Sequence, residues 1–337
     1  MGMGEKIMPA THASIFDNDE VKTALVTGAT GFIGSYLVRA LVSRKFHVRV
    51  YSRSTITEDF KELIGNRDWI TGELTDACQL ASACQGVDIV FHAAGIADTR
   101  GSNVDETLKV NVEGTKNVHS ASVHAGVRKF IYFSSALAGD SSMGDYAYSK
   151  RLAENYLRES RKVKTATQIL ILRPAKVYGR GMRGNLSLLI RYASLGVLPS
   201  LPEISRTIYL VSVEDLCRLA IALAIRPNRD NEPLYRLVTD NQEYTLNRIE
   251  EAIYSSLGRS LPRWKMPRLV LLCLALLAQL ANLTRVRKNK VGQQLYRYLT
   301  EEGGEVQHIR PPQSNDQATQ TLEQELPSII KSMNTGK

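Results

Sequence analysis

The feature that most constrains the fold is a glycine-rich stretch directly after an apolar, β-branched run near the start of the chain. It reads TGATGFIG over residues 27–34, and a segment of helical periodicity follows it. Glycines at this spacing allow a tight turn, close approach of the backbone to a pyrophosphate, and close packing of a helix on a strand. The first N–H groups of the helix then attract phosphate. The sequence therefore predicts a dinucleotide site built on Gly28, Gly31 and Gly34.

Short β-branched runs alternate with helical stretches from residue 21 to residue 134. Strands are expected at residues 22–27, 48–52, 69–71, 89–92 and 130–134, with helices at 36–44 and 110–125 among others. Alternation of this period predicts a parallel sheet covered by helices on both faces. The predicted fold class is therefore α/β, a Rossmann-type doubly wound parallel sheet.

Beyond about residue 175 the alternation loosens and prolines become frequent. A length of 337 residues suggests about two folding units. We expect a flexible extension over residues 1–20, a dinucleotide-binding domain over 21–175, and a smaller substrate-binding lobe over 176–333, parts of which return to the first domain. The extension is acidic and has no long apolar run, so it does not resemble a signal peptide.

The positive charge of the chain is concentrated in one window. The formal net charge is +9, and no acidic residue stands between Glu251 and Glu301, where nine basic residues account for the whole surplus. This pattern indicates an anionic partner near the window and not a nucleic-acid-binding protein. Four scattered cysteines with no ligand-like spacing predict no disulfide framework and no metal site, and a cytoplasmic protein.

The window contains the most apolar run of the chain, residues 269–283, with basic residues on both sides. At about 1.5 Å per residue it reaches about 22 Å, short of a roughly 30 Å bilayer core, so a membrane-spanning helix is not expected. A buried helix and a helix at a membrane surface both stay open. The second predicts peripheral contact through residues 263–290 at the inner face of the membrane.

Cofactor choice depends on the end of the second predicted strand. An acidic residue there would bind the ribose hydroxyls of NAD, but this chain has Arg53, 25 positions after Gly28. Because an arginine can pair with a 2′-phosphate, we favour NADP over NAD, and NAD stays open.

A candidate catalytic group follows the fifth predicted strand. Tyr146 and Lys150 stand four residues apart, on one face of a helix. A tyrosine with a pKa near 10 is a poor base, and we expect a neighbouring ammonium, with the positive nicotinamide close by, to lower that pKa. Ser135 ends the strand before them, and we prefer it to Ser134 as the group that hydrogen-bonds the reacting oxygen.

Six motifs occur in the order typical of one family: TGATGFIG (27–34), VFHAAG (90–95), VNVEGT (110–115), FSSA (133–136), YAYSK (146–150) and LRPAKVYG (172–179). Over about residues 21–260 the chain resembles the extended short-chain dehydrogenase/reductases of the NAD-dependent epimerase/dehydratase family. The resemblance implies that the dinucleotide is lined by Phe32, Ile33, Glu73, Leu74, Ala93, Ala94, Gly95 and Asn111, and that Tyr146 and Lys150 also contact it. The family usually has an aspartate where Glu73 stands.

The stretch over residues 181–216 resembles sugar 4-ketoreductases and polyprenyl-diphosphate-sugar 4-epimerases. Many sugar epimerases hold the substrate diphosphate with an arginine at the position of Ile208, and Arg206 is the nearest arginine here. Lys176 replaces an asparagine that often binds substrate, and could contact a phosphate. Tyr146 follows Ser135 by only 11 positions, which shortens a loop that is longer in sugar epimerases.

The resemblance implies NAD(P)-dependent chemistry at C4 of a nucleotide- or polyprenyl-diphosphate-linked sugar, either epimerisation or reduction, in surface-polysaccharide biosynthesis. Residues 84–95 and 111–136 also resemble 3β-hydroxysteroid dehydrogenases, so a sterol or another lipid alcohol is an alternative substrate. A non-catalytic NADP-binding sensor is a third possibility, although Tyr146 and Lys150 are both present. Many relatives form homodimers through the helices that precede and contain the tyrosine, and a homodimer is expected here.

Overall fold

The computed structural model describes residues 22–55, 57–65, 68–97, 103–139, 144–163, 165–196, 199–204, 207–227, 233–267, 269–270, 273 and 320–335. The expected extension over residues 1–20 lies outside these residues.

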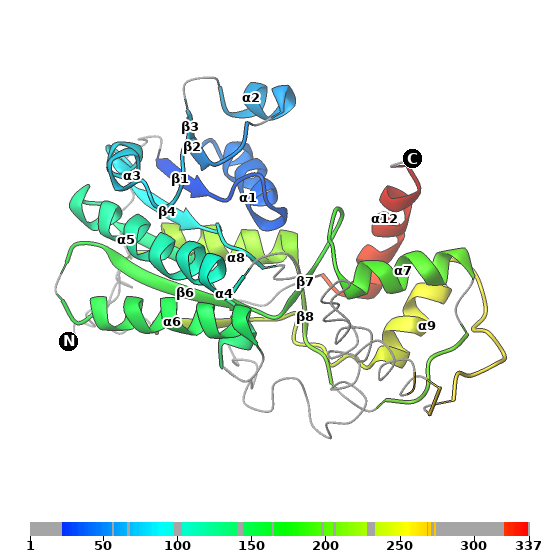
Figure 1. Ribbon diagram of the computed structural model, residues 1–337. Helices are drawn as coiled ribbons and strands as arrows, with labels where there is room; N and C mark the ends of the chain where they lie inside the picture. The colour runs from blue at the N-terminus through cyan, green and yellow to red at the C-terminus, as the bar shows by residue number, and fades with distance from the viewer. Residues whose placement is uncertain are drawn as a thin grey trace, which may run out of the picture.

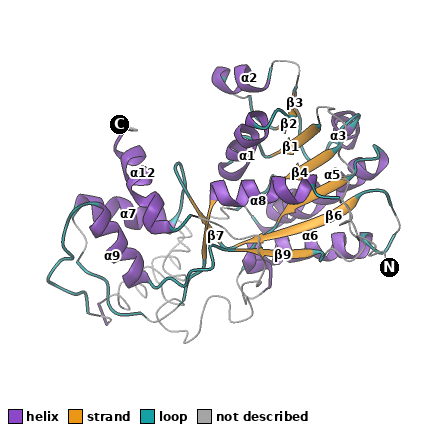
Figure 2. Ribbon diagram, turned by 180° about the vertical axis from the view of Figure 1, so that it is seen from behind, coloured by secondary structure: helices purple, strands orange, loops and turns teal. Residues whose placement is uncertain are grey.

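A sheet of seven strands, paired in parallel throughout, forms the larger part of the molecule (Figures 1 and 2). Its spatial order is β3-β2-β1-β4-β5-β6-β9, which reverses direction between β1 and β4. In such sheets, ligands bind beyond the carboxyl ends of the strands at this reversal. The predicted doubly wound α/β fold is thereby confirmed, although β6 and β9 were not predicted as strands. The strands are β1 (Thr23–Thr27), β2 (His47–Ser52), β3 (Trp69–Thr71), β4 (Ile89–His92), β5 (Lys129–Phe133), β6 (Gln168–Pro174) and β9 (Tyr235–Val238).

Helices cover both faces of the sheet because successive side chains of a strand point to opposite faces. In β1, Ala24 and Val26 belong to one core and Leu25 to the other. The first core is completed by α1 (Phe32–Ser43), α2 (Glu58–Ile64) and α8 (Val213–Ile225). The second is completed by α3 (Ala77–Cys84), α5 (Gly114–His124) and α6 (Asp145–Ser160).

The helix predicted over residues 110–125 has a wider turn at its start. A short α4 (Val104–Leu108) leads into one π-helical turn, Lys109–Glu113, before α5 begins. Single π turns inside helices often occur at functional sites, and this one carries Asn111. A 3₁₀ turn, Ala136–Gly139, follows β5.

A smaller lobe lies beside the carboxyl edge of the sheet (Figure 1). It holds a two-stranded parallel sheet, β7 (Lys176–Tyr178) with β8 (Leu210–Ser212), and the helices α7 (Asn185–Leu195), α9 (Leu246–Ser256) and α12 (Leu322–Thr335). The three helices pack around one apolar core. The chain after residue 175 also supplies α8 and β9 to the larger part, and the expected boundary at that residue stays a prediction.

The apolar run over residues 269–283 lies almost wholly outside the described residues. Leu269, Val270 and Cys273 are its described members, and all three are exposed, which does not fit a buried helix at this end of the run. Among the helices of the described ranges, none has the length and apolar character needed to cross a bilayer.

Candidate active site

The loop between β1 and α1 has the geometry of a phosphate cradle. Gly28 has a φ of +72°, and a Cβ there would lie 2.6 Å from the Cα of Ala94, so a larger residue does not fit. Gly31 donates its N–H to the carbonyl of Gly28 at 2.9 Å and is the N-cap residue of α1, where no side chain caps the helix. The first turn of α1 also contains no acidic residue. Its first N–H groups are therefore available to an anion.

A cavity of about 450 Å³ extends from this loop along the carboxyl edge of the sheet. Thr30, Ser52, Ser54, Thr75, Glu106 and Lys109, which the sequence did not single out, add polar groups to its wall. The tight glycine cradle and the polar walls fit a dinucleotide. Eight predicted cofactor residues line the cavity: Gly28, Gly31, Arg53, Glu73, Leu74, Ala93, Ala94 and Gly95.

Other predicted cofactor residues lie around this cavity without lining it. Phe32 and Ile33 begin α1, and Gly34 is buried against Gly28. Asn111 exchanges two hydrogen bonds with the backbone of Ile96, accepting at 2.7 Å and donating at 3.0 Å. Asn111 thereby fixes the strand end that carries Gly95.

Lys150 and Tyr146 come from the first turns of α6. The Lys150 ammonium donates to the carbonyl of Phe133 at 2.8 Å and lies 4.7 Å from the ring centre of Tyr132. A Cβ on Gly95 would be 3.4 Å from Lys150 Nζ, so the ammonium lies beside the Gly95 end of the cavity. Tyr146 is half-buried.

The two serines at the end of β5 have different partners. Ser135 hydrogen-bonds the Tyr146 side chain, whereas the Ser134 hydroxyl donates to Glu154 at 2.6 Å. The structure therefore brings Ser135, Tyr146 and Lys150 together, and it directs Ser134 away from them.

The lowering of the Tyr146 pKa is expected with an oxidised nicotinamide close by, and it stays a prediction; the groups of the protein alone act in the opposite direction. Burial raises the pKa of Tyr146 to about 12, and the hydrogen bond with Ser135 only partly opposes it. Burial also lowers the pKa of Lys150 to about 8, against the opposite influence of Glu154. The physical reason is that desolvation disfavours both charged forms. The positive charge of an oxidised nicotinamide would act against it at Tyr146.

Glu154 is a polar residue of the site that the sequence reasoning missed. It is almost fully buried, and Arg173 binds it with two hydrogen bonds, at 2.9 Å to Oε1 and 2.6 Å to Oε2. Glu154 stands four residues after Lys150 on α6, so both lie on one face. The position of this carboxylate one helical turn after Lys150 is the sequence feature from which Glu154 could have been predicted.

His92 connects the strand ends below the cavity to α5. One ring nitrogen lies 2.6 Å from the Thr27 hydroxyl and the other 3.0 Å from the Thr115 hydroxyl. Burial, with a smaller effect of the Lys150 charge, lowers the pKa of His92 to about 3. The neutral ring is therefore part of the support under the site.

The predicted substrate residues are less well assembled. Lys176 lies on β7 with an exposed side chain, and Arg206 lies outside the described residues. Ile208, at the family's arginine position, is buried and exchanges backbone hydrogen bonds with Tyr244 at 2.7 and 3.0 Å. A phosphate contact is therefore not available from residue 208.

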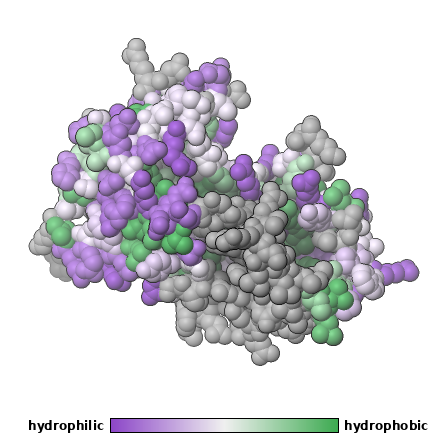
Figure 3. All heavy atoms as spheres, viewed as in Figure 1, coloured by the Kyte–Doolittle hydropathy of each residue, from purple (hydrophilic) through white to green (hydrophobic). Residues whose placement is uncertain are grey.

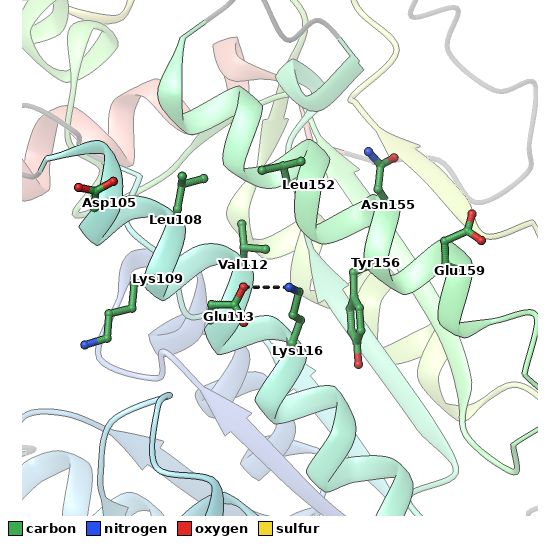
Figure 4. A pocket seen from close by; sticks show the side chains of 10 residues that line it. All are labelled: Asp105, Leu108, Lys109, Val112, Glu113, Lys116, Leu152, Asn155, Tyr156 and Glu159. Carbon is green, nitrogen blue, oxygen red and sulfur yellow. Dashed lines mark hydrogen bonds and ion pairs between the residues drawn. The ribbon is translucent and has the colours of Figure 1, made fainter.

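A second cavity contains none of the predicted catalytic residues. This groove of about 730 Å³ runs between the α4–α5 segment and α6. Figure 4 shows Leu108 and Val112 on one side of it and Leu152 and Tyr156 on the other, with charged groups around them. One of these groups, Lys116, pairs with Glu113 at 2.8 Å.

Comparison with known proteins places this geometry in a family. Residues 24–235 match the sequence model of the NAD dependent epimerase/dehydratase family. The chain belongs to this family. The dependence on NAD in the family's name agrees with the glycine cradle, and the family is the one that the sequence motifs resemble.

Three relatives have names that point to different substrates. A ceramide reductase of Caulobacter vibrioides is 33% identical over 202 residues, which cover 60% of this chain and 61% of that protein. A UDP-glucose 4-epimerase of Vibrio cholerae is 27% identical over 274 residues, 74% of this chain and 80% of that enzyme. A 3 beta-hydroxysteroid dehydrogenase type 7 of Mus musculus is 33% identical over 196 residues, 49% of this chain and 53% of that protein.

Solved structures of similar fold cover nearly the whole chain. The crystal structure of gox2253 superimposes with a TM-score of 0.71 at 22% identity, covering 94% of this chain and 98% of that one. A UDP-glucose 4-epimerase from Thermotoga maritima gives a TM-score of 0.68 at 18% identity, covering 93% and 99%. At these identities the likeness establishes the fold alone.

Proposed function

We propose that the chain is an NAD(P)-dependent oxidoreductase that transfers a hydride at C4 of a diphosphate-linked sugar, as an epimerase or a 4-ketoreductase of surface-polysaccharide biosynthesis. One observation carries the choice of a sugar. The similarity to the Vibrio UDP-glucose 4-epimerase covers 74% of this chain and so continues into the smaller lobe, where substrate specificity is expected. The steroid dehydrogenase matches about half of the chain. This is close to the length of the expected dinucleotide-binding domain, residues 21–175, which we call the cofactor half.

The site residues have the chemistry that this proposal needs. The Tyr146 hydroxyl exchanges a proton with the substrate oxygen, and Ser135 hydrogen-bonds the tyrosine and orients that oxygen. The Lys150 ammonium, beside Gly95, stabilises the tyrosinate by its charge. When bound, the nicotinamide supplies or accepts the hydride.

On the substrate side, we propose that Lys176 and Arg206 contact the diphosphate. Lys176 is exposed on β7, where an ammonium can act on a phosphate as a point charge. With Ile208 buried, these two cations replace the contact that an arginine at residue 208 would make.

A lipid alcohol is the second candidate substrate. It is favoured by the identity of 33% to both the ceramide reductase and the steroid dehydrogenase, higher than the 27% to the sugar epimerase. The proton-transfer chemistry of Tyr146, Ser135 and Lys150 would be the same for either alcohol.

We further propose a cytoplasmic homodimer that prefers NADP. The apolar floor of the groove between α5 and α6 would be covered by the same helices of a second copy, an isologous contact. A Leu152→Arg variant is then expected to be monomeric in light scattering. Unchanged dimers would exclude this face.

The first experiment is to purify the protein, denature it mildly and identify the nicotinamide that is released. NAD released at near one-to-one supports an epimerase that returns its own hydride. An empty protein that binds NADPH reversibly supports a 4-ketoreductase.

The second experiment compares two substrate panels, with Tyr146→Phe as the inactive control for both. One panel holds UDP-glucose, UDP-N-acetylglucosamine and a nucleotide-linked 4-keto-6-deoxy sugar, followed by NMR for C4 products and by NADPH absorbance. The other holds 3-ketoceramide and 3β-hydroxysterols in detergent. Turnover of the lipid panel alone would overturn the sugar proposal and leave the hydride-transfer site intact.

A further inference from the structure

Helix α7 has exposed apolar side chains on a face that the core of the described residues does not use. Leu186 and Ile190 point inward and pack against α9 and α12. Leu188, Tyr192 and Leu195 nevertheless have exposed fractions of 38%, 45% and 62%. Their spacing of four and then three residues places them along one side of the helix. Leu188, Tyr192 and Leu195 therefore form an exposed apolar stripe that is not part of the described core of the lobe.

A second exposed apolar segment is held against the end of α7. Ser200, five residues after α7 ends at Leu195, donates its N–H to the Trp264 carbonyl at 3.1 Å, and its carbonyl accepts from the Met266 N–H at 2.8 Å. Arg259 donates to the carbonyl of Ser194, in the last turn of α7, at 2.8 Å. The exposed fractions of Trp264, Leu269 and Val270 are 65%, 73% and 43%.

We call Leu188, Tyr192, Leu195, Trp264, Leu269 and Val270 together the tip surface. In both ribbon views, α7 and the loop after α9 lie at the end of the smaller lobe that points away from the large sheet (Figures 1 and 2). In the space-filling view, hydrophobic residues lie at the outer edge of this lobe (Figure 3).

The charges around the tip surface are mostly positive. Arg191 is exposed on α7, and Arg259, Arg263 and Lys265 are exposed in the loop after α9. Lys265 pairs with Glu203 at 2.9 Å. The sequence then continues to residue 300 without an acidic residue. The acids that precede the loop in α9 are Glu250, buried against Ser200 and Leu201, and the exposed Glu251.

We propose that the tip surface binds the anionic surface of a lipid bilayer. Apolar side chains surrounded by Lys and Arg suit the interface between headgroups and acyl chains, and Trp and Tyr are enriched at that depth. A second copy of the chain fits less well, because a two-fold contact would face these cations with themselves. The surface reaches back to α7, beyond the stretch 263–290 that the sequence indicated. The proposal goes beyond the proposed function, because it does not depend on which alcohol is the substrate.

Trp264 provides a direct test, because the chain has only two tryptophans. The other, Trp69, lies in β3 and donates to the Ser52 hydroxyl at 3.2 Å. In a Trp69→Phe variant, Trp264 alone reports on its surroundings. The full chain is mixed with vesicles of phosphatidylcholine, with or without phosphatidylglycerol, and fluorescence and co-sedimentation are measured. We expect a blue shift and an affinity at least about tenfold higher for the anionic vesicles, lost at high salt.

Two substitutions separate the surface from the fold. Leu195→Glu on α7 and Arg263→Glu in the loop are each expected to lower vesicle affinity by about tenfold, because they add charge to the apolar stripe or reverse a cation. Val163→Glu, at an equally exposed valine just after α6, is the matched control and should bind vesicles as the unchanged chain does. Circular dichroism verifies that all three variants are folded.

Three results would overturn the proposal. They are equal binding to neutral and anionic vesicles, a Trp264 spectrum that vesicles do not change, and equal losses in Leu195→Glu and Val163→Glu. Self-association that Leu195→Glu abolishes, without vesicle binding, would assign the tip surface to a second copy instead.

Discussion

Two groups of charged residues, one in each half of the molecule, are held in opposite ways. In the cofactor half, Lys150 and Glu154 are buried and held by hydrogen bonds to Phe133, Ser134 and Arg173. In the smaller lobe, Lys265 and Glu203 pair in the open, with side chains 63% and 84% exposed. Buried groups fix a reaction geometry, whereas exposed groups can be exchanged at little cost. This difference fits the proposal that the hydride chemistry is built into the sheet and that the partner is selected at the surface of the lobe.

The largest expected effect comes from removing the reacting proton. Tyr146→Phe should lower turnover by roughly 10²–10⁴-fold, because a positioned acid–base group contributes about that much. Binding of the cofactor should stay close to normal, since the glycine cradle is untouched. Steady-state kinetics and a cofactor titration test both parts.

Tyr148→Phe is the matched control for this change. Tyr148 is two residues further along α6 and 45% exposed, so it points away from the buried site. If Tyr148→Phe loses as much turnover as Tyr146→Phe, the proton transfer is assigned to the wrong tyrosine.

Two matched truncations test whether the buried and the exposed carboxylate differ in their contribution to the free energy of unfolding. Glu154→Ala leaves the half-buried Arg173 guanidinium without its carboxylate and should lower the free energy of unfolding by about 3–5 kcal/mol. Glu203→Ala removes an exposed partner in the lobe and should change it by no more than about 1 kcal/mol. Urea unfolding of both variants measures the two values. Similar losses would mean that the two halves do not differ in this respect.

A milder substitution of Glu154 tests its effect on Lys150 separately from its effect on stability. Glu154 raises the pKa of Lys150 against the effect of burial. Glu154→Gln should therefore lower that pKa below about 8, and the ammonium should be lost at a lower pH. The alkaline limb of the pH–rate profile is expected to move to lower pH; a limb that does not move would leave Glu154 with a structural role only.

Acid should destabilise the cofactor half first, because all the histidines of the described ranges, His47, His92, His119 and His124, lie there. Burial lowers the pKa of His92 to about 3 and of His119 to about 4, from 6.5. Below pH 6.5 the two histidine rings bind protons in the unfolded chain but stay neutral in the folded chain. The free energy of unfolding therefore falls as the pH falls towards these pKa values. At about 1.4 kcal/mol per pH unit for each ring, the two cost about 4 kcal/mol between pH 7 and pH 5.

Replacing one ring measures this contribution directly. His92→Gln should remove about half of the loss between pH 7 and pH 5, because glutamine does not titrate there. His124→Gln, at an exposed position of α5, is the control and should keep the full slope. Equal slopes in all three proteins would assign the acid sensitivity to other groups.

The sequence predicted the cofactor half in detail because its signals are local. The glycines after β1 and the alternation of apolar runs determined the sheet, and helical spacing put Tyr146 and Lys150 on one face. Glu154 was missed because its partner Arg173 is 19 residues away on β6, and such pairing has no local pattern. The rise that burial causes in the pKa of Tyr146 was not anticipated, because burial is a property of the whole fold.

The lobe was harder to predict for the same physical reason. Its core joins α7, α9 and α12, and α12 begins 66 residues after α9 ends, so no short window contains the contacts. Lys176 and Arg206 were chosen by their place in family motifs. The exposed stripe on α7 was not anticipated, because the same helix also has a buried apolar side and the sequence does not say which one is covered.

The last prediction concerns the cofactor and tests an exposed charge in the cofactor half. Arg53 is exposed beside the cofactor cavity at the end of β2. A charge-assisted hydrogen bond to a 2′-phosphate contributes about 1.5–3 kcal/mol, so Arg53→Ala should weaken NADP binding by about tenfold or more and leave NAD nearly unchanged. Lys109→Ala is the control, since Lys109 also lines this cavity but comes from the π turn instead of β2. Titration of both cofactors against each variant decides whether the cation after β2 selects the phosphate. Equal losses for NADP and NAD would make Arg53 a surface charge, replaceable like those of the lobe.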